Sequence, residues 1–171
     1  IDITIDHGTE AHLVVDEVKA SGFPVIVGTD LTSRSKLEVQ NMNFKTNKIL
    51  AEAGVLIAVT TDHPVALIQY LPLCAGLAVK EGLPMEEGLK AITINPAKIC
   101  RVDQRVGTLE AGKDADIAIF TGNPMEVFTK TLYTIIDGQI IYNGMKDDDE
   151  FTLPPVSAGN DIPKAVHAEN E

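Results

Sequence analysis

Two polar side chains, His7 and Asp62, each follow a run of residues with the pattern of a β-strand. His7 comes after residues 1–6, which alternate isoleucine with polar residues, and Asp62 comes shortly after the wholly apolar residues 55–59. In parallel α/β barrels, active sites are built at the carboxyl ends of the strands. A neutral imidazole and a carboxylate that converge there suit zinc-type coordination. The carboxylate could also act as a general base toward water activated by a metal.

On spacing alone, these residues also have ordinary structural interpretations. A histidine after a strand often lies in a loop, and an aspartate before a helix is often its N-cap. His63, beside Asp62, contacts substrate, holds Asp62 in place or simply begins the next helix. Arg34 and Lys36 lie in a polar loop over residues 28–43, where they could meet an anionic substrate group or remain solvated.

The elements that must position these residues alternate between strand and helix. A helix is expected from about residue 9 to Gly22, then a buried strand at 24–27, a loop at 28–43 and a helix ending at Gly54. The first helix carries one apolar stripe, formed by Ala11, Val14, Val15 and Val18. This order is the βαβ pattern of a parallel α/β fold.

Beyond Asp62 the chain is expected to be largely helical. Pro72 must kink this helical region or start a new helix, and Pro84 marks another helix start. Asn95 and Pro96 are expected as the N-cap and first residue of a further helix.

The pattern changes after Gly107, where strands are expected at 116–120, 133–136 and 139–142. Asp137-Gly138 joins the last two, and Asp-Gly is a strong hairpin signal. These strands form an antiparallel unit that needs partners from elsewhere.

Composition limits the class of protein. The 171 residues are 44% hydrophobic and 23% charged, a soluble globular mix with a formal net charge of −11. The acidity argues against a nucleic-acid partner, and no apolar run approaches the ~20 residues that a membrane span needs. Cys74 and Cys100 are expected to be free, buried thiols in a reducing compartment, which favours the cytoplasm.

Four runs of sequence together resemble the amidohydrolase superfamily, and its imidazolonepropionase-related branch in particular. They are His-Gly-Thr-Glu at 7–10, Thr-Asp-His-Pro at 61–64, Thr-Ile-Asn-Pro-Ala at 93–97 and Gly-Thr-Leu-Glu-Ala-Gly-Lys-Asp-Ala-Asp at 107–116. The resemblance covers roughly residues 3–143. It implies an α/β chain that is the C-terminal part of a (β/α)₈ TIM barrel, strands six to eight with their helices, followed by strands of a small β-sandwich.

The same resemblance implies a division of the chain. Residues 1–103 would be the barrel portion, 104–144 the sandwich strands and 145–171 an acidic, partly disordered tail. Strand six would end at His7 and strand eight just before Asp62. The family's remaining metal ligands, on strands one, four and five, have no counterpart in this sequence.

The resemblance also implies the chemistry. Asp62 matches an aspartate that binds metal and shuttles a proton from water to the leaving nitrogen. His7 matches a histidine that is a metal ligand in many members and in others contacts the attacking water or the substrate carbonyl. We therefore predict a catalytic and metal-binding pair, His7 and Asp62, a divalent metal with zinc foremost, and substrate contacts from His63 and Arg34.

The expected function is that of a fragment of a hydrolase that cleaves non-peptide C–N bonds, such as those of cyclic amides, in a small-molecule substrate. The fragment is expected to be inactive alone, and its partner would be the missing N-terminal half or a second copy. The alternative is a non-catalytic truncated domain, a scaffold that binds a small molecule or a partner.

Overall fold

The computed structural model describes residues 2–145. The acidic tail expected at 145–171 lies outside the described residues, apart from Met145, and so does Ile1 of the expected first strand.

Two short parallel strands form the centre of the larger part of the molecule. β1 (Val25–Val27) pairs with β2 (Ile57–Val59) in the register Val25 to Ile57. In the sequence, the segment that connects the two strands contains the 3₁₀ helix η2 (Leu37–Val39) and α2 (Thr46–Glu52). The parallel pairing predicted from the order of elements is therefore confirmed.

The expected strand at residues 1–6 is reduced to a single bridge. Ile5 pairs in parallel with Val25, its amide donates to Pro24 O, and its carbonyl accepts from the Ile26 amide. The prediction of a longer strand was wrong because a strand also needs backbone partners, and residues 2–4 are exposed beside this short β1.

The helix expected from residue 9 is split in two. η1 covers Ala11–Val14 and α1 covers Val15–Ser21, so Val14 is half exposed and does not belong to a single buried stripe. Gly22 ends α1 in the left-handed conformation, with φ 68°, as its position after the apolar stripe predicted.

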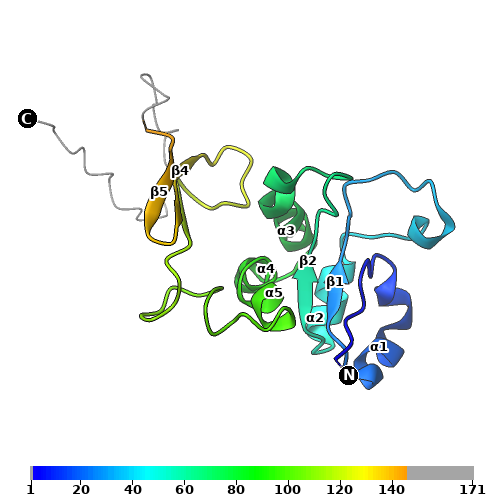
Figure 1. Cartoon of the computed structure of the whole chain (residues 1–171). Helices are drawn as coiled ribbons and strands as arrows, with labels where there is room; N and C mark the ends of the chain where they lie inside the picture. Colours follow the sequence, from blue (N-terminus) through cyan, green and yellow to red (C-terminus); the bar gives the residue numbers. More distant parts are fainter. Residues whose placement is uncertain (1, 146–171) are drawn as a thin grey trace, which may run out of the picture.

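Four more helical segments follow β2. They are η3 (Ile68–Tyr70), α3 (Leu71–Lys80), α4 (Met85–Lys90) and α5 (Ile94–Ile99). Pro72 lies in the first turn of α3, so it starts this helix instead of kinking it, and Pro84 is the N-cap of α4. In Figure 1, α3, α4 and α5 lie on the side of β2 and α1 lies on the side of β1.

The assignment of Asn95 and Pro96 as N-cap and first helical residue was wrong. Thr93 is the N-cap, and Asn95 is inside α5. The buried amide of Asn95 donates to Ile57 O at 2.9 Å. It therefore ties α5 to β2, a long-range contact that local capping rules do not include.

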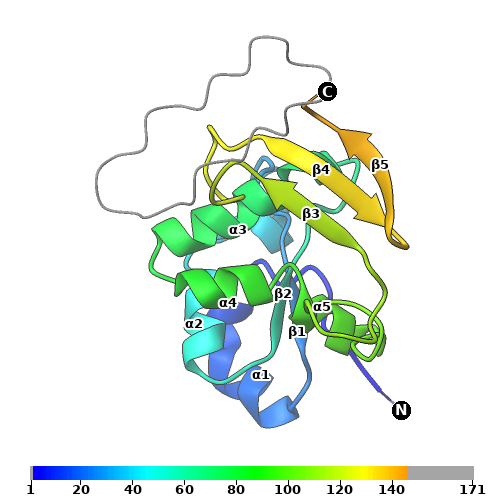
Figure 2. The same ribbon diagram turned by 90° about the vertical axis from the view of Figure 1, so that its left-hand side faces the viewer.

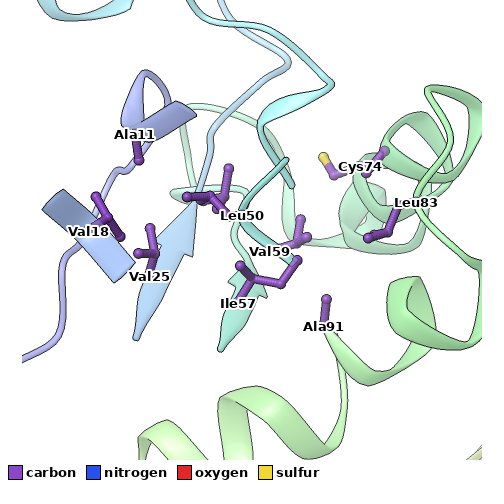
Figure 3. Close-up of a cluster of buried hydrophobic side chains, with 11 residues drawn as sticks. Ala11, Val18, Val25, Leu50, Ile57, Val59, Cys74, Leu83 and Ala91 are labelled. Carbon is purple, nitrogen blue, oxygen red and sulfur yellow. The ribbon is translucent and has the colours of Figure 1, made fainter. Parts of the chain in front are cut away.

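The hydrophobic core lies between β1, β2 and these helices. Figure 3 shows Val25, Leu50, Ile57, Cys74 and Leu83 converging there, each 2% exposed or less. Both cysteines are free, as predicted. The expected burial of Cys100 was wrong, because this residue follows the last turn of α5 and is exposed.

A separate antiparallel sheet has the order β3 (Ile117–Phe120), β4 (Thr131–Ile136) and β5 (Gln139–Asn143). Figure 2 shows it as a twisted layer beyond α3. Asp137 and Gly138 join β4 to β5 with φ of 49° and 75°, the positive values of a tight hairpin turn, so the predicted hairpin is confirmed. Within residues 2–145, every helix falls short of the length and apolar character that a membrane span requires.

Candidate active site

The two residues singled out from the sequence lie side by side. Nε2 of His7 is 3.3 Å from Oδ1 of Asp62, although the residues are 55 positions apart. His7 follows the Ile5 bridge and Asp62 follows β2, so both leave the same edge of the parallel strands. The predicted proximity of the pair is therefore confirmed.

Both residues adopt a backbone conformation that side chains rarely tolerate. The φ angles are 53° for His7 and 51° for Asp62, in the left-handed region. Such strain persists only where the surrounding structure holds it in place, and it concentrates at functional sites. Among the described non-glycine residues, Arg101 and Asp137 share this conformation, so in His7 and Asp62 it marks a sharp turn of the backbone after each strand segment.

Glycines allow the backbone to approach closely around this pair. A Cβ on Gly8 would lie 2.4 Å from Cγ1 of Val25, and one on Gly28 would lie 2.4 Å from Thr60 O. Gly8 follows His7, and its amide donates to Ile26 O at 2.9 Å. Only residues without a side chain fit here, so the backbone directly after His7 packs against β1.

Asp62 does not cap a helix. Residues 62–66 form turns and a bend, and η3 begins only at Ile68. The Asp62 amide donates to Oγ1 of Thr60 at 3.1 Å, while its carboxylate faces His7. Its carboxylate is therefore available for chemistry.

The pair matches the geometry of two ligands on one zinc ion. Two donors bonded to a tetrahedral zinc at about 2.0–2.1 Å are separated by ~3.4 Å. The 3.3 Å between Nε2 and Oδ1 agrees with that separation. In residues 2–145, no group of three or more His, Cys, Asp or Glu side chains is arranged to hold a metal. The described residues thus fit part of a metal site.

Sequence reasoning missed a third polar residue at this position. Asp6 accepts the His7 amide proton through Oδ1 at 3.0 Å, and its Oδ2 is 3.7 Å from Nδ1 of His7. The imidazole thus lies between two carboxylates, Asp6 at Nδ1 and Asp62 at Nε2. The available signal was the adjacency of Asp6 to His7.

A pocket of about 440 Å³ opens beside the pair. Its lining includes His7, Asp62 and residues of the loop after β1, among them Thr29, Thr32, Ser33, Ser35, Lys36 and Glu38. Arg34 is not part of this lining; its Nη2 donates to Met42 O at 3.0 Å. His63 is exposed and also lies outside the lining. Substrate contacts from Arg34 and His63 therefore stay predictions, while Lys36 is the cationic side chain that borders the pocket.

The residues after His7 hold the pocket loop in place. Oγ1 of Thr9 donates to Glu38 O at 3.3 Å, and Oε1 of Glu10 accepts the Asn41 amide proton at 2.7 Å. The His-Gly-Thr-Glu run therefore has distinct structural tasks. His7 faces Asp62, Gly8 allows the close approach to β1, and Thr9 and Glu10 fasten the loop that lines the pocket.

His12 supports the same junction. The Thr46 hydroxyl donates to Thr9 O at 3.1 Å and lies 2.7 Å from Nδ1 of His12. The Thr46 hydroxyl thus links the ring of His12 to the backbone of Thr9. This arrangement agrees with a structural role for His12.

Behind the pocket lies a buried carboxyl that the sequence did not reveal. Asp30 is 5% exposed, and burial raises its pKa to about 6. In the described part of the chain, neither its Oδ1 nor Oγ1 of the neighbouring Thr29 has a hydrogen-bond partner. Burial, with a contribution from the charge of Asp30, raises the pKa of the Cys74 thiol to about 11, so this thiol is protonated at neutral pH and is not a nucleophile.

Comparison with known proteins identifies the family. Residues 6–142 match the family described as the amidohydrolase family. The imidazolonepropionase of Syntrophobacter fumaroxidans is 42% identical over 76 residues, which are 43% of this chain and 18% of that protein. The N-substituted formamide deformylase of Arthrobacter pascens is 27% identical over 110 residues, covering 54% of this chain and 20% of that protein.

A solved structure shows the same fold. The amidohydrolase from Thermotoga maritima MSB8 superposes with a TM-score of 0.79 at 37% identity, over 82% of this chain and 37% of that one. The chain therefore spans less than half the length of these relatives. With the family matched across most of the chain, the resemblance noted in the sequence is confirmed, and this chain belongs to the amidohydrolase family.

Proposed function

We propose that this chain is the C-terminal portion of a metal-dependent amidohydrolase whose parent protein hydrolyses a non-peptide C–N bond in a small metabolite. The observation that carries the proposal is the 3.3 Å contact between Nε2 of His7 and Oδ1 of Asp62 beside a pocket. In this proposal the parallel strands are barrel strands seven and eight, the Ile5 segment is strand six, and β3–β5 belong to a small sandwich.

In this proposal a divalent metal, with zinc foremost, would be held by His7 Nε2 and an oxygen of Asp62. When bound, such a metal polarises a carbonyl and makes water acidic enough to attack it. Asp62 would accept a proton from the attacking water and then donate it to the leaving nitrogen. His7 would hold its Nε2 lone pair toward the same point. The hydroxyls and Lys36 along the pocket loop would bind polar groups of the substrate.

The described residues provide two donors, whereas zinc sites use three or four protein ligands. We therefore expect the isolated chain to bind zinc weakly and to catalyse nothing by itself. Calorimetric titration with Zn²⁺ tests the metal pair. Weak binding that His7→Ala and Asp62→Ala each abolish is the expected result. Nanomolar binding lost with Asp62→Ala would contradict an incomplete site.

A scaffold without catalytic activity is the second candidate, favoured by the apolar surface of the antiparallel sheet. Ile140 and Ile141 on β5 are 60% and 62% exposed, and exposed apolar patches of this kind promote association. We expect the chain to associate with the rest of its parent protein or with a second copy. Size-exclusion chromatography with light scattering tests this, and a monodisperse monomer of 18.4 kDa with a cooperative melt would contradict it.

A further inference from the structure

Asp6 is the carboxylate nearest to the side of His7 that faces away from Asp62. Its Oδ1 accepts the His7 amide proton at 3.0 Å, and its Oδ2 lies 3.7 Å from Nδ1. One carboxylate thus contacts both the backbone and the ring of the same residue. The backbone contact helps to hold His7 at φ 53°, a conformation that costs free energy for a residue with a side chain.

The other acidic residue of the same segment behaves differently. Asp2 pairs with Arg101 at the far end of α5, an exposed ion pair that connects two parts of the surface. Within residues 2–145, the hydrogen bond and the ion-pair contact of the Asp6 carboxylate are both with His7. The position of Asp6 is therefore directed at the histidine and not at a neighbouring cation.

A neutral imidazole has one N–H and one lone pair, on different nitrogens. If Nδ1 carries the proton, Nε2 presents its lone pair toward Asp62, where a metal would be held. A carboxylate at Nδ1 favours this tautomer, and a metal between Nε2 and Asp62 would keep the nearer carboxylate, 3.3 Å from Nε2, from selecting the Nε2–H form instead. At 3.7 Å the contact is longer than a direct hydrogen bond, and such contacts commonly tighten when the site is complete.

We propose that Asp6 is a positioning residue, which holds His7 in the Nδ1–H tautomer and directs its Nε2 toward the point it shares with Asp62. This inference rests on the proposed metal role of His7 and Asp62. It predicts that Asp6 matters for metal affinity although it is not a ligand. Loss of such a supporting carboxylate typically weakens metal affinity about 10- to 100-fold.

The first test measures the Zn²⁺ affinity of the 171-residue chain by direct calorimetric titration at protein concentrations high enough to detect weak binding. Asp6→Ala is expected to weaken binding about 10- to 100-fold, and Asp6→Asn less, because the amide oxygen can still accept from Nδ1–H. Asp16→Ala, which removes the same charge from exposed α1, is the matched control and should bind like wild type.

Comparison with Asp62→Ala separates the two ideas. Loss of binding in Asp62→Ala but not in Asp6→Ala would overturn the positioning role and leave the metal pair intact. Zinc binding that is unchanged in both variants would contradict the metal pair itself.

A second measurement needs no metal. In an Asp62→Ala background the ring loses its neighbour at Nε2, and imidazole ¹⁵N shifts at a pH where the ring is neutral report the tautomer of His7. The expected tautomer is Nδ1–H, which should revert, when Asp6→Ala is added, to the Nε2–H form that predominates in free histidine. An Nε2–H tautomer with Asp6 present would overturn the proposal, whatever the zinc affinities.

Discussion

The parallel part of the molecule and the antiparallel sheet are both regular, yet only the first has a buried core. Val25 and Val27 of β1 are fully buried, and all three residues of β2 are buried. By contrast, every residue of β3, β4 and β5 is exposed or half-buried. Strand pairing and turn residues are therefore enough to define a sheet geometry, while a core requires a second layer.

A buried methionine lies where the loop of the antiparallel sheet meets the helices. Met125, in the loop between β3 and β4, is 7% exposed and packs against α3 and α4. A Cβ on Gly76 would lie 2.7 Å from Met125 O, and one on Gly88 would lie 3.2 Å from its Cε. Small residues on two helices thus make room for this loop.

The largest expected difference between the regions concerns buried leucine. Leu50→Ala removes a side chain that is 0% exposed, and we expect it to destabilise the parallel part by about 2–5 kcal/mol. Ile140→Ala, at 60% exposure, should change stability by no more than ~0.5 kcal/mol. Hydrogen exchange followed by mass spectrometry measures both regions at once. Equal acceleration of exchange in β3–β5 by the two variants would show that the regions unfold as one.

The next effect depends on pH and belongs to the parallel part alone. The folded pKa of Asp30 is about 6, above the ordinary 3.8, so between these values the folded chain holds more protons than the unfolded chain. The free energy of unfolding should therefore fall as pH rises from about 4 to about 6. Above that range the full cost of ionising the buried Asp30 carboxyl should be present. Asp30→Asn should remove roughly 1–3 kcal/mol of this fall.

The matched control for Asp30 is in the other region. Asp137→Asn removes the same charge at an exposed turn where asparagine tolerates the left-handed backbone. Denaturant unfolding across pH 4–7 compares each variant with wild type. A stability difference between Asp30→Asn and wild type that does not vary with pH would contradict a buried, protonated Asp30.

The smallest effect compares two glycines at which an added Cβ would meet no steric clash. Gly138 in the hairpin and Gly22 after α1 have φ of 75° and 68°, and a Cβ on Gly22 would meet nothing within 4 Å. Alanine at either position should cost about 1 kcal/mol from backbone strain alone. Exchange should accelerate in β4 and β5 for Gly138→Ala and in α1 for Gly22→Ala. A larger loss for Gly138 would indicate that the hairpin carries more of the stability than its burial implies.

The features that the sequence predicted correctly were those with local signals. The Asp137-Gly138 hairpin, the helix end at Gly22 and the order of parallel strands all follow from neighbouring residues. The proximity of His7 and Asp62 followed from their places at strand ends. The family resemblance added their expected roles.

The features that the sequence missed depend on contacts between distant segments. Asn95 was wrongly assigned as a helix cap because the assignment used only its neighbour Pro96. Its side-chain hydrogen bond to Ile57 O joins residues 38 positions apart. The fastening of the pocket loop by Glu10 spans 31 positions, and the buried Asp30 acts on the pKa of Cys74, which lies in α3. The strand predicted at residues 1–6 is a single bridge at Ile5, because the length of a strand depends on backbone pairing partners and not on strand propensity alone.

Whether His7 and Asp62 bind one metal ion is tested by locating zinc with anomalous diffraction at the zinc edge in crystals of the wild-type chain grown with Zn²⁺. The expected result is a peak within about 2.0–2.2 Å of both Nε2 of His7 and a carboxylate oxygen of Asp62. Zinc bound elsewhere, with the His7 and Asp62 side chains turned apart, would contradict the assignment of these residues as a metal-binding pair.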